Sequence, residues 1–256
     1  MKTIGRVSGW CRGLLNGRSS SVGTANEAAR VAWLEQALKK IPAGGRILDA
    51  GAGEQRFRFL CTHLNYVSQD FAQYDGKGDG RGLQMGTWHP DKLDIVCDIT
   101  SIPEPDFAFD AIMCIEVFEH LPKPLLALKE FSRLLRPGGH LILTAPFCSI
   151  THFAPYYFYT GFSRYFFERH LPEFGFEMEE ISANGNFYEY LAQEMRRISD
   201  ISRRYSSARL RPWELLARWV MLAALRRFSS QEKGSDELLC FGYHVRAVRR
   251  ADQHEI

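Results

Sequence analysis

The chain has 256 residues, 45% of them hydrophobic, which is enough to bury one main core together with an elaboration. Its 32 basic and 30 acidic residues leave a formal net charge of +2, too small to favour nucleic acid as a partner. Six widely spaced cysteines without a C-x-x-C pair argue against a zinc knuckle or a disulfide framework. The cysteine pattern fits a reducing compartment, so we expect a cytoplasmic protein, with a membrane-peripheral location as the alternative. No apolar run approaches the length of a membrane span.

Hydrophobic periodicity predicts alternating helices and strands between residues 25 and 147. A helix begins near Ala25 and ends at Pro42. Strands are predicted at RILDAGAG, NYVSQD, DIVCD, FDAIMCI and HLILTAPF, with helices at EQRFRFLCTHL and PLLALKEFSRLL and a turn at residues 136–139. This alternation is typical of an α/β fold in which helices cover both faces of a mostly parallel sheet.

The composition changes after the fifth strand. Residues 148–175 are rich in Phe and Tyr and predict an aromatic cap over a pocket, although a second core is the alternative. A sixth strand (FEMEEIS), a helical insert at about 186–230 and a closing strand (ELLCFGYHVRAVR) follow. We interpret residues 1–24 as a lead-in and residues 25–256 as one domain.

The helical insert carries a local excess of positive charge. Nine arginines and only two acids lie between Arg196 and Arg227. Tryptophans and basic flanks are features of helices that lie on membrane surfaces. Two alternatives stay open for residues 196–228 besides packing on the domain: a peripheral membrane contact and a homodimer contact.

A glycine turn follows the first strand in ILDAGAGEQRF. Gly51 and Gly53 allow a ligand to approach the backbone closely, but Arg56 stands where the dinucleotide fingerprint has its third glycine. Asp49 would also repel a pyrophosphate. A ligand with a cationic end, such as S-adenosylmethionine (SAM), suits this turn better than a nicotinamide dinucleotide.

Further residues follow in the order that SAM binding requires. The segments ILDAGAG, YVSQD, VCDITSIP, FDAIMCIEVFEHL and LLRPGGHLILTAPF together resemble the class I SAM-dependent methyltransferases. The resemblance implies a Rossmann-like, mostly parallel seven-stranded sheet with a final antiparallel strand. It also implies a set of cofactor-binding residues: Asp49, Gly51 and Gly53 at the turn, Asp70 for the ribose, Asp98 and Ile99 for the adenine, and Glu116 at the rim.

Transfer of a methyl group to a hydroxyl is helped by a base that removes the proton. Two histidines follow strands whose ends should face the pocket, and we expect His152, then His120, to be catalytic. The alternative for both is a packed structural histidine. No metal is intrinsically required, and we predict none.

The aromatic cap also resembles a branch of bacterial methyltransferases associated with glycan and small-molecule biosynthesis. This resemblance implies a small acceptor, most simply a hydroxyl of a sugar or glycan precursor. Arg164, Tyr156 and Tyr157 are the predicted substrate-binding residues; a salt bridge with Glu168 is the structural alternative for Arg164. A catalytically silent SAM-binding partner protein is the main alternative function, because cofactor motifs report binding and not turnover.

Overall fold

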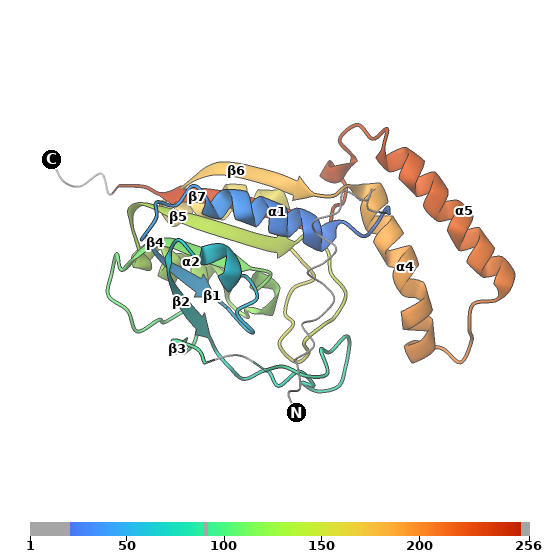
Figure 1. Ribbon diagram of the computed structural model, residues 1–256, viewed down its shortest axis with the longest axis horizontal. Coiled ribbons are helices and arrows are strands. Elements are labelled where there is room, and N and C mark those ends of the chain that lie inside the picture. The colour runs from blue at the N-terminus through green and yellow to red at the C-terminus, as the bar shows by residue number, and fades with distance from the viewer. Residues whose placement is uncertain (1–20, 90–91, 252–256) are drawn as a thin grey trace, which may run out of the picture.

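The computed structural model describes residues 21–89 and 92–251; residues 1–20 of the predicted lead-in lie outside this part. The chain folds around a seven-stranded sheet with the order β3-β2-β1-β4-β5-β7-β6 (Figure 1). The first five strands pair in parallel, and β7 is antiparallel to both β5 and β6. The predicted α/β class, with its mostly parallel sheet and final antiparallel strand, is confirmed.

The elements follow the alternation seen in the sequence. The strands are β1 (Arg46–Ala50), β2 (Asn65–Asp70), β3 (Ile95–Val96), β4 (Phe109–Ile115), β5 (Leu135–Pro146), β6 (Phe176–Asn184) and β7 (Gly242–Arg249). The helices are α1 (Asn26–Leu38), α2 (Pro124–Leu134), α3 (Arg164–Glu173), α4 (Phe187–Tyr205) and α5 (Pro212–Ser229), with short 3₁₀ turns η1 (Arg58–Cys61), η2 (Phe118–His120) and η3 (Ser235–Glu237).

Two apolar cores cover the two faces of the sheet. Successive strand residues point to opposite faces, so Ile112 packs in the core beneath α2 and α3, while Met113 packs in the core beneath α1. Both side chains are fully buried. Burial on both faces explains why β4 is apolar throughout, as central parallel strands usually are.

The segment after the glycine turn differs from its prediction. Residues 54–64 were expected to be helical, but only η1 forms there. Gln55 has a φ of +54°, in the left-handed region that breaks a right-handed helix. The polypeptide therefore stays in tight turns until β2 begins.

Two other expectations are wrong in detail. Strand β5 begins at Leu135, directly after α2, so residues 136–139 belong to an irregular start of the strand rather than to a separate turn. A shift in pairing register between Phe109 and Ala111 accommodates them. The aromatic cap also contains a helix, α3, which the density of Phe and Tyr had concealed.

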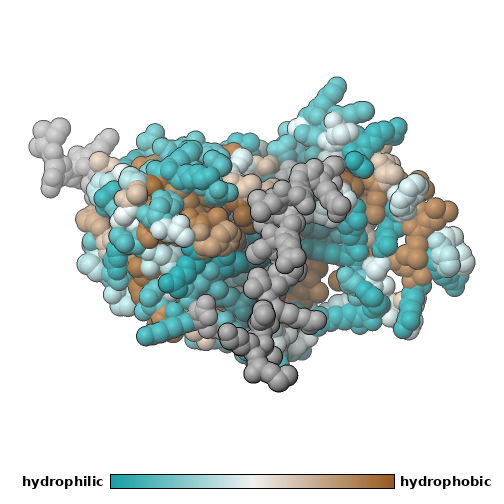
Figure 2. All heavy atoms as spheres, viewed as in Figure 1, coloured by the Kyte–Doolittle hydropathy of each residue, from teal (hydrophilic) through white to brown (hydrophobic). Residues whose placement is uncertain are grey.

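The helical insert forms a hairpin of α4 and α5 beside one end of the sheet (Figure 1). Val22, from the segment before α1, packs against Ala192 and Leu225 at the base of this hairpin. Figure 2 shows apolar atoms along the outer helix, where the exposed hydrophobic residues are Trp213, Leu215, Leu216, Trp219, Val220, Met221 and Phe228. Within the described residues, no helix is long and apolar enough to cross a bilayer.

Candidate functional site

The glycine turn lies at the carboxyl end of β1. The N–H groups of Gly51 and Ala52 both donate to the carbonyl of Gln69, at 2.9 and 2.8 Å. Gly51 and Gly53 have φ values of +80° and +50°, and a Cβ atom on either would lie 2.6 Å from a side-chain carbon, of Val117 and Trp88 respectively. Neither position accepts a larger residue without rearrangement.

Asp49 is buried immediately before this turn. Its Oδ2 atom accepts a hydrogen bond of 2.6 Å from the hydroxyl of Tyr66, and in the described part of the chain no group donates to Oδ1. Burial raises the pKa of Asp49 to about 7; the Tyr66 hydrogen bond opposes this and the charge of Asp70 adds to it. A cation beside Oδ1 would compensate the buried charge, so the residue fits the ammonium end of SAM.

Asp70 ends β2 next to the turn. Its Oδ2 accepts from the Gly53 N–H at 3.0 Å, and its Oδ1 accepts from the Ala72 N–H at 2.8 Å. The side chain is only 9% exposed, less than expected for a carboxylate that grips ribose hydroxyls. Each oxygen keeps a further lone pair for a ligand, and Asp70 also holds the glycine turn in place.

The predicted adenine pair is divided between surface and core. Asp98 is exposed and caps a turn, because its Oδ1 accepts from both the N–H and the hydroxyl of Thr100. Ile99 is buried in the core cluster beneath α2 and α3. Capping leaves one Asp98 oxygen for another donor.

Glu116 follows β4 with a φ of +55°, a backbone conformation that non-glycine residues seldom adopt outside functional or strained sites. The Thr144 hydroxyl donates to its Oε1 at 2.9 Å. Arg30 from α1 lies 3.6 Å from its Oε2. Among the described residues, the buried Nε of Arg30 has no hydrogen-bond partner.

Sequence reasoning missed Arg30, because a single arginine on an amphipathic helix carries no distinguishing pattern. Only the packing of α1 beside the end of β4 reveals it. Arg30 lines a small polar hollow of about 300 Å³.

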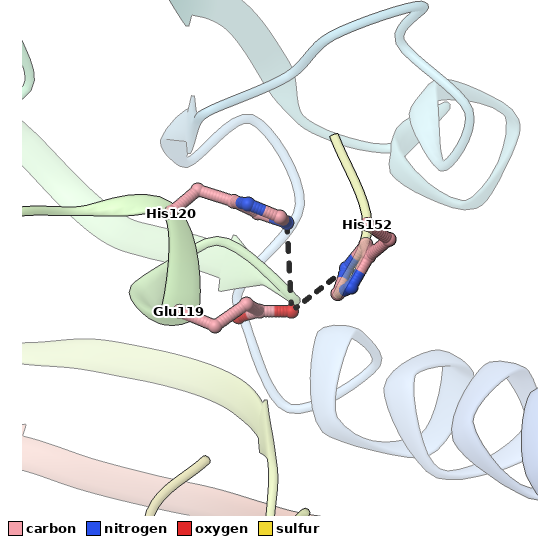
Figure 3. Close-up of side chains that lie close together, drawn as sticks. All are labelled: Glu119, His120 and His152. Carbon is pink, nitrogen blue, oxygen red and sulfur yellow. Dashed lines mark ion pairs between the residues drawn. The ribbon is translucent and has the colours of Figure 1, made fainter. Parts of the chain in front are cut away.

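Both predicted catalytic histidines lie together in the structure. His120 follows β4 and His152 lies in the loop after β5, and their rings meet edge to face with centroids 4.7 Å apart. Figure 3 shows both rings directed toward the carboxylate of Glu119. The Nε2 atoms of His120 and His152 lie 3.7 and 3.8 Å from the same atom, Oε1 of Glu119.

Burial controls the charge of this cluster. Burial lowers the pKa of His120 to about 4, with a further decrease from the charge of His152, and burial also lowers the pKa of His152. The pKa of Glu119 is raised well above its usual value, first by burial and then by the charge of Glu116. Sequence reasoning missed Glu119; its place beside His120 in VFEHL was the available signal.

The cap residues divide into two groups. The Tyr156 carbonyl accepts from Nδ1 of His120 at 2.5 Å, and the Tyr157 ring lies 5.2 Å from the His152 ring. These two predicted substrate-binding residues therefore adjoin the histidines. Arg164 instead begins α3 and pairs with Glu168 at 2.8 Å, and within the described residues no hydrogen bond or ion pair joins it to the cluster.

A largely apolar pocket of about 540 Å³ lies beside His152, between α4 and the loops after β2 and β5. Ile150 and Thr151 line it immediately before His152, and Arg197 on α4 lies close enough for its charge to lower the pKa of His152. The volume is within the range of small-molecule sites. The predicted helical insert thus supplies one wall of a pocket.

Residues 24–181 match a family model described as a methyltransferase domain. Among curated proteins, the chain is similar to ubiquinone biosynthesis O-methyltransferases. One from Dechloromonas aromatica is 28% identical over 123 residues, covering 45% of this chain and 49% of the relative; one from Xanthomonas oryzae pv. oryzae is 31% identical over 105 residues, covering 40% and 43%. The chain spans about half the length of the curated relatives it matches.

Solved structures with the same fold include the [4+2]-cyclase SpnF, with a TM-score of 0.54, 19% identity and coverage of 92% of this chain and 84% of that one. A geranyl diphosphate methyltransferase in complex with GPP and sinefungin has a TM-score of 0.50, 14% identity and coverage of 87% and 78%. Because one of these neighbours is a cyclase, the shared fold does not by itself determine the reaction.

Proposed function

The chain belongs to the class I SAM-dependent methyltransferases, and on this premise we propose that it transfers a methyl group to a hydroxyl of a small acceptor with an apolar body. One observation carries the proposal. The cluster of Glu119, His120 and His152 lies at the same edge of the sheet as the glycine turn, and the residues directly before His152 line the apolar pocket. Both the glycine turn and the histidine cluster follow the carboxyl ends of parallel strands, which is where such folds bind ligands.

SAM supplies an electrophilic methyl group on a sulfonium centre. The protein has to hold the two ends of that ligand and exclude water. Asp49 accepts from the ammonium group, and Arg30 pairs with the carboxylate of the same end. Asp70 accepts from the ribose hydroxyls, Asp98 from the adenine amino group, and Glu116 keeps Arg30 in position. Ile99 supports the adenine side from the core.

The acceptor hydroxyl meets the histidine cluster. A neutral imidazole with a lone pair on Nε2 can accept the proton of a hydroxyl as it attacks. His152 and His120 therefore act on the hydroxyl, and Tyr157 and the backbone of Tyr156 hold the rings. Arg164, which is paired and exposed, is suited only to an outlying anionic group of the acceptor.

The residues that line the pocket indicate which kind of acceptor it can hold. Leu83, Ile150, Ile198 and Ile201 line it together with polar residues such as Glu194 and Arg197, and most of the exposed lining is apolar. Aliphatic side chains offer few hydrogen bonds to the many hydroxyls of a sugar. The names of the curated relatives also favour O-methylation. An acceptor with one reactive hydroxyl on an apolar body fits these walls better than the sugar or glycan precursor expected from the sequence.

The test has two stages. Calorimetric titration with SAM, S-adenosylhomocysteine and NAD should show binding of the first two only. The protein is then incubated with SAM and two acceptor panels, alkylated phenols and catechols in one and sugar nucleotides in the other, with mass analysis of the products. Methylated phenols support the proposal, and methylated sugars would contradict the proposal that the acceptor has an apolar body. Binding of SAM without transfer to either panel would support a silent SAM-binding protein instead.

A further inference from the structure

Three lone-pair donors converge in the cluster of Glu119, His120 and His152. The candidate ligand atoms of these residues all lie within 4.8 Å of one another. Figure 3 shows that they come from two different loops, the turn after β4 and the loop after β5, and point toward one another. No hydrogen bond joins Glu119 to either ring, because the gaps of 3.7 and 3.8 Å are too long for one.

Backbone carbonyls determine which nitrogen of each ring carries hydrogen. The Nδ1–H of His120 donates to Tyr156 O at 2.5 Å, and the Nδ1–H of His152 donates to Ile150 O at 2.9 Å. In the neutral rings both Nε2 atoms are consequently bare. Fixing Nδ1–H in this way and leaving Nε2 as the ligand is how proteins orient metal-binding histidines.

At the carboxyl group of Glu119, burial and the charge of Glu116 outweigh the favourable charge of Arg30. The side chain is 1% exposed, and its Oε2 atom has no hydrogen-bond partner in the described structure. A buried polar atom without a partner is costly. Its backbone is nevertheless held firmly, since the Glu119 carbonyl accepts from the N–H groups of both Phe158 and Tyr159 in the cap.

We propose that Glu119, His120 and His152 form a binding site for one divalent cation of the first transition row. Two imidazole nitrogens and one carboxylate suit Zn²⁺, Mn²⁺ or Co²⁺ better than Mg²⁺ or Ca²⁺, which prefer oxygen ligands alone. A cation placed between the three donors adds a positive charge directly beside the buried carboxyl group. It also removes the repulsion among three converging lone pairs.

The spacing is compatible with a shared ion. Two donors at about 2.0–2.1 Å from one metal are at most about 4.2 Å apart, and the two distances to Glu119 are below that limit. The widest spacing, within 4.8 Å, would have to shorten slightly when the ion binds. Three protein ligands would leave further coordination positions for a ligand from outside the chain.

The proposed metal site rests on the proposed function, and it gives the two histidines a specific role in the methyl transfer. An acceptor hydroxyl bound at an open position loses its proton more readily, because the cation stabilises the alkoxide or phenolate. His120 and His152 then serve as ligands rather than as free bases. From the sequence we predict no metal, and the proposed site departs from that prediction.

The experiment is calorimetric titration of tag-free protein, stripped with EDTA, with Mn²⁺, Zn²⁺ and Mg²⁺ separately, without SAM or acceptor. We expect about one tight site per chain for Mn²⁺ or Zn²⁺ and much weaker binding of Mg²⁺. Glu119→Gln and His152→Ala should each weaken that site at least about tenfold. His170→Ala is the matched control, because His170 pairs with Glu173 on the surface of α3, away from the cluster.

A second measurement keeps the site testable if a variant folds poorly. Wild-type protein loaded with Co²⁺ should show the visible absorption of a site with nitrogen ligands, and Zn²⁺ should displace it. Wild-type affinity no greater than that of His152→Ala, with no Co²⁺ spectrum, would overturn the metal site. SAM binding and methyl transfer, measured in parallel in EDTA, separate the two proposals. Undiminished methyl transfer overturns only the role of the metal. Failure to bind SAM overturns the proposed methyltransferase function and leaves the metal site unaffected.

Discussion

The Tyr66 hydroxyl donates to Oδ2 of Asp49 over 2.6 Å, so a residue of β2 holds the acid that precedes the glycine turn of β1. The bond lowers the pKa of Asp49, but burial outweighs it and leaves that pKa at about 7. Burial and the charge of Asp49 raise the pKa of Tyr66, so its hydroxyl keeps its proton and remains a donor. The charge of Asp49 is therefore variable near neutral pH.

The affinity for SAM should consequently rise with pH up to about pH 7 and then level off. Below that pH, Asp49 must lose a proton before it can pair with an ammonium group, and the affinity changes by up to about tenfold per pH unit. Calorimetry at a series of pH values measures this. Asp49→Asn should bind weakly and without the slope, and Tyr66→Phe should move the midpoint to higher pH. Tyr165→Phe, at an exposed position on α3, is the control.

The same residue affects stability with the opposite sign. The folded chain holds the Asp49 proton up to about pH 7, whereas an unfolded aspartate loses it near pH 4. Between these values the folded state binds more protons, so the contribution of Asp49 to the free energy of unfolding falls as pH rises. The melting temperature of Asp49→Asn should therefore increase relative to that of the wild type as the pH is raised from 4 to 7. A constant difference would contradict the buried carboxyl.

Gly53→Ala should reduce SAM affinity at least about tenfold and lower the melting temperature. A left-handed alanine costs about 1–2 kcal/mol, and its Cβ would also displace Trp88. Gly44→Ala isolates the first effect, because Gly44 has a φ of +81° but no atom of the described chain lies within 4 Å of the added Cβ. Thermal shift and calorimetry of both variants measure the two effects. Equal loss of affinity in both would show that Gly53 has no special place in the site.

Asp70→Asn should weaken SAM binding about 10- to 100-fold, as expected when hydrogen bonds to a charged acceptor are lost. The asparagine oxygen can still accept from the Gly53 N–H, so the turn should survive. Asp70→Ala removes both functions and should also lower the melting temperature. Unchanged SAM affinity in Asp70→Asn would restrict Asp70 to holding the turn.

Arg30→Met should weaken binding of SAM at least about tenfold while leaving adenosine binding unchanged. Methionine preserves the aliphatic packing of the side chain but cannot pair with a carboxylate. Competition titrations with SAM and adenosine separate the two ends of the ligand. Arg169→Met is a control, since Arg169 is an exposed partner of Glu173 on α3. Loss of both affinities together would indicate a general structural defect.

Ile201→Asp should raise the KM for an apolar acceptor and leave SAM affinity within about twofold, because a charge in an aliphatic wall is poorly solvated. Ile201 lines the apolar pocket from α4. Val220→Asp introduces the same charge on the exposed surface of α5, and its kinetics should match those of the wild type. Steady-state kinetics of both variants with a phenolic acceptor make the comparison.

The succession of strands along the chain, the glycine turn and the placement of Asp49 and Asp70 at strand ends could be predicted from the sequence, because short apolar runs and glycine-rich turns are local signals. The conformation of residues 54–64 could not be predicted, because the helical pattern there does not indicate the left-handed backbone of Gln55. The helix α3 was likewise concealed, because its aromatic residues pack against one another and fit a cap equally well.

The sequence by itself determined a sheet with its cofactor turn, since each of those features depends on residues close together in the chain. Only the tertiary structure decided that Glu119, His120 and His152 converge, because the two histidines lie 32 positions apart. They meet because backbone hydrogen bonds join the cap to the turn after β4. It likewise brought Arg30 beside Glu116 and made α4 a wall of the pocket. Contacts between distant segments depend on how cores and loops pack together, and no local pattern in the chain encodes them.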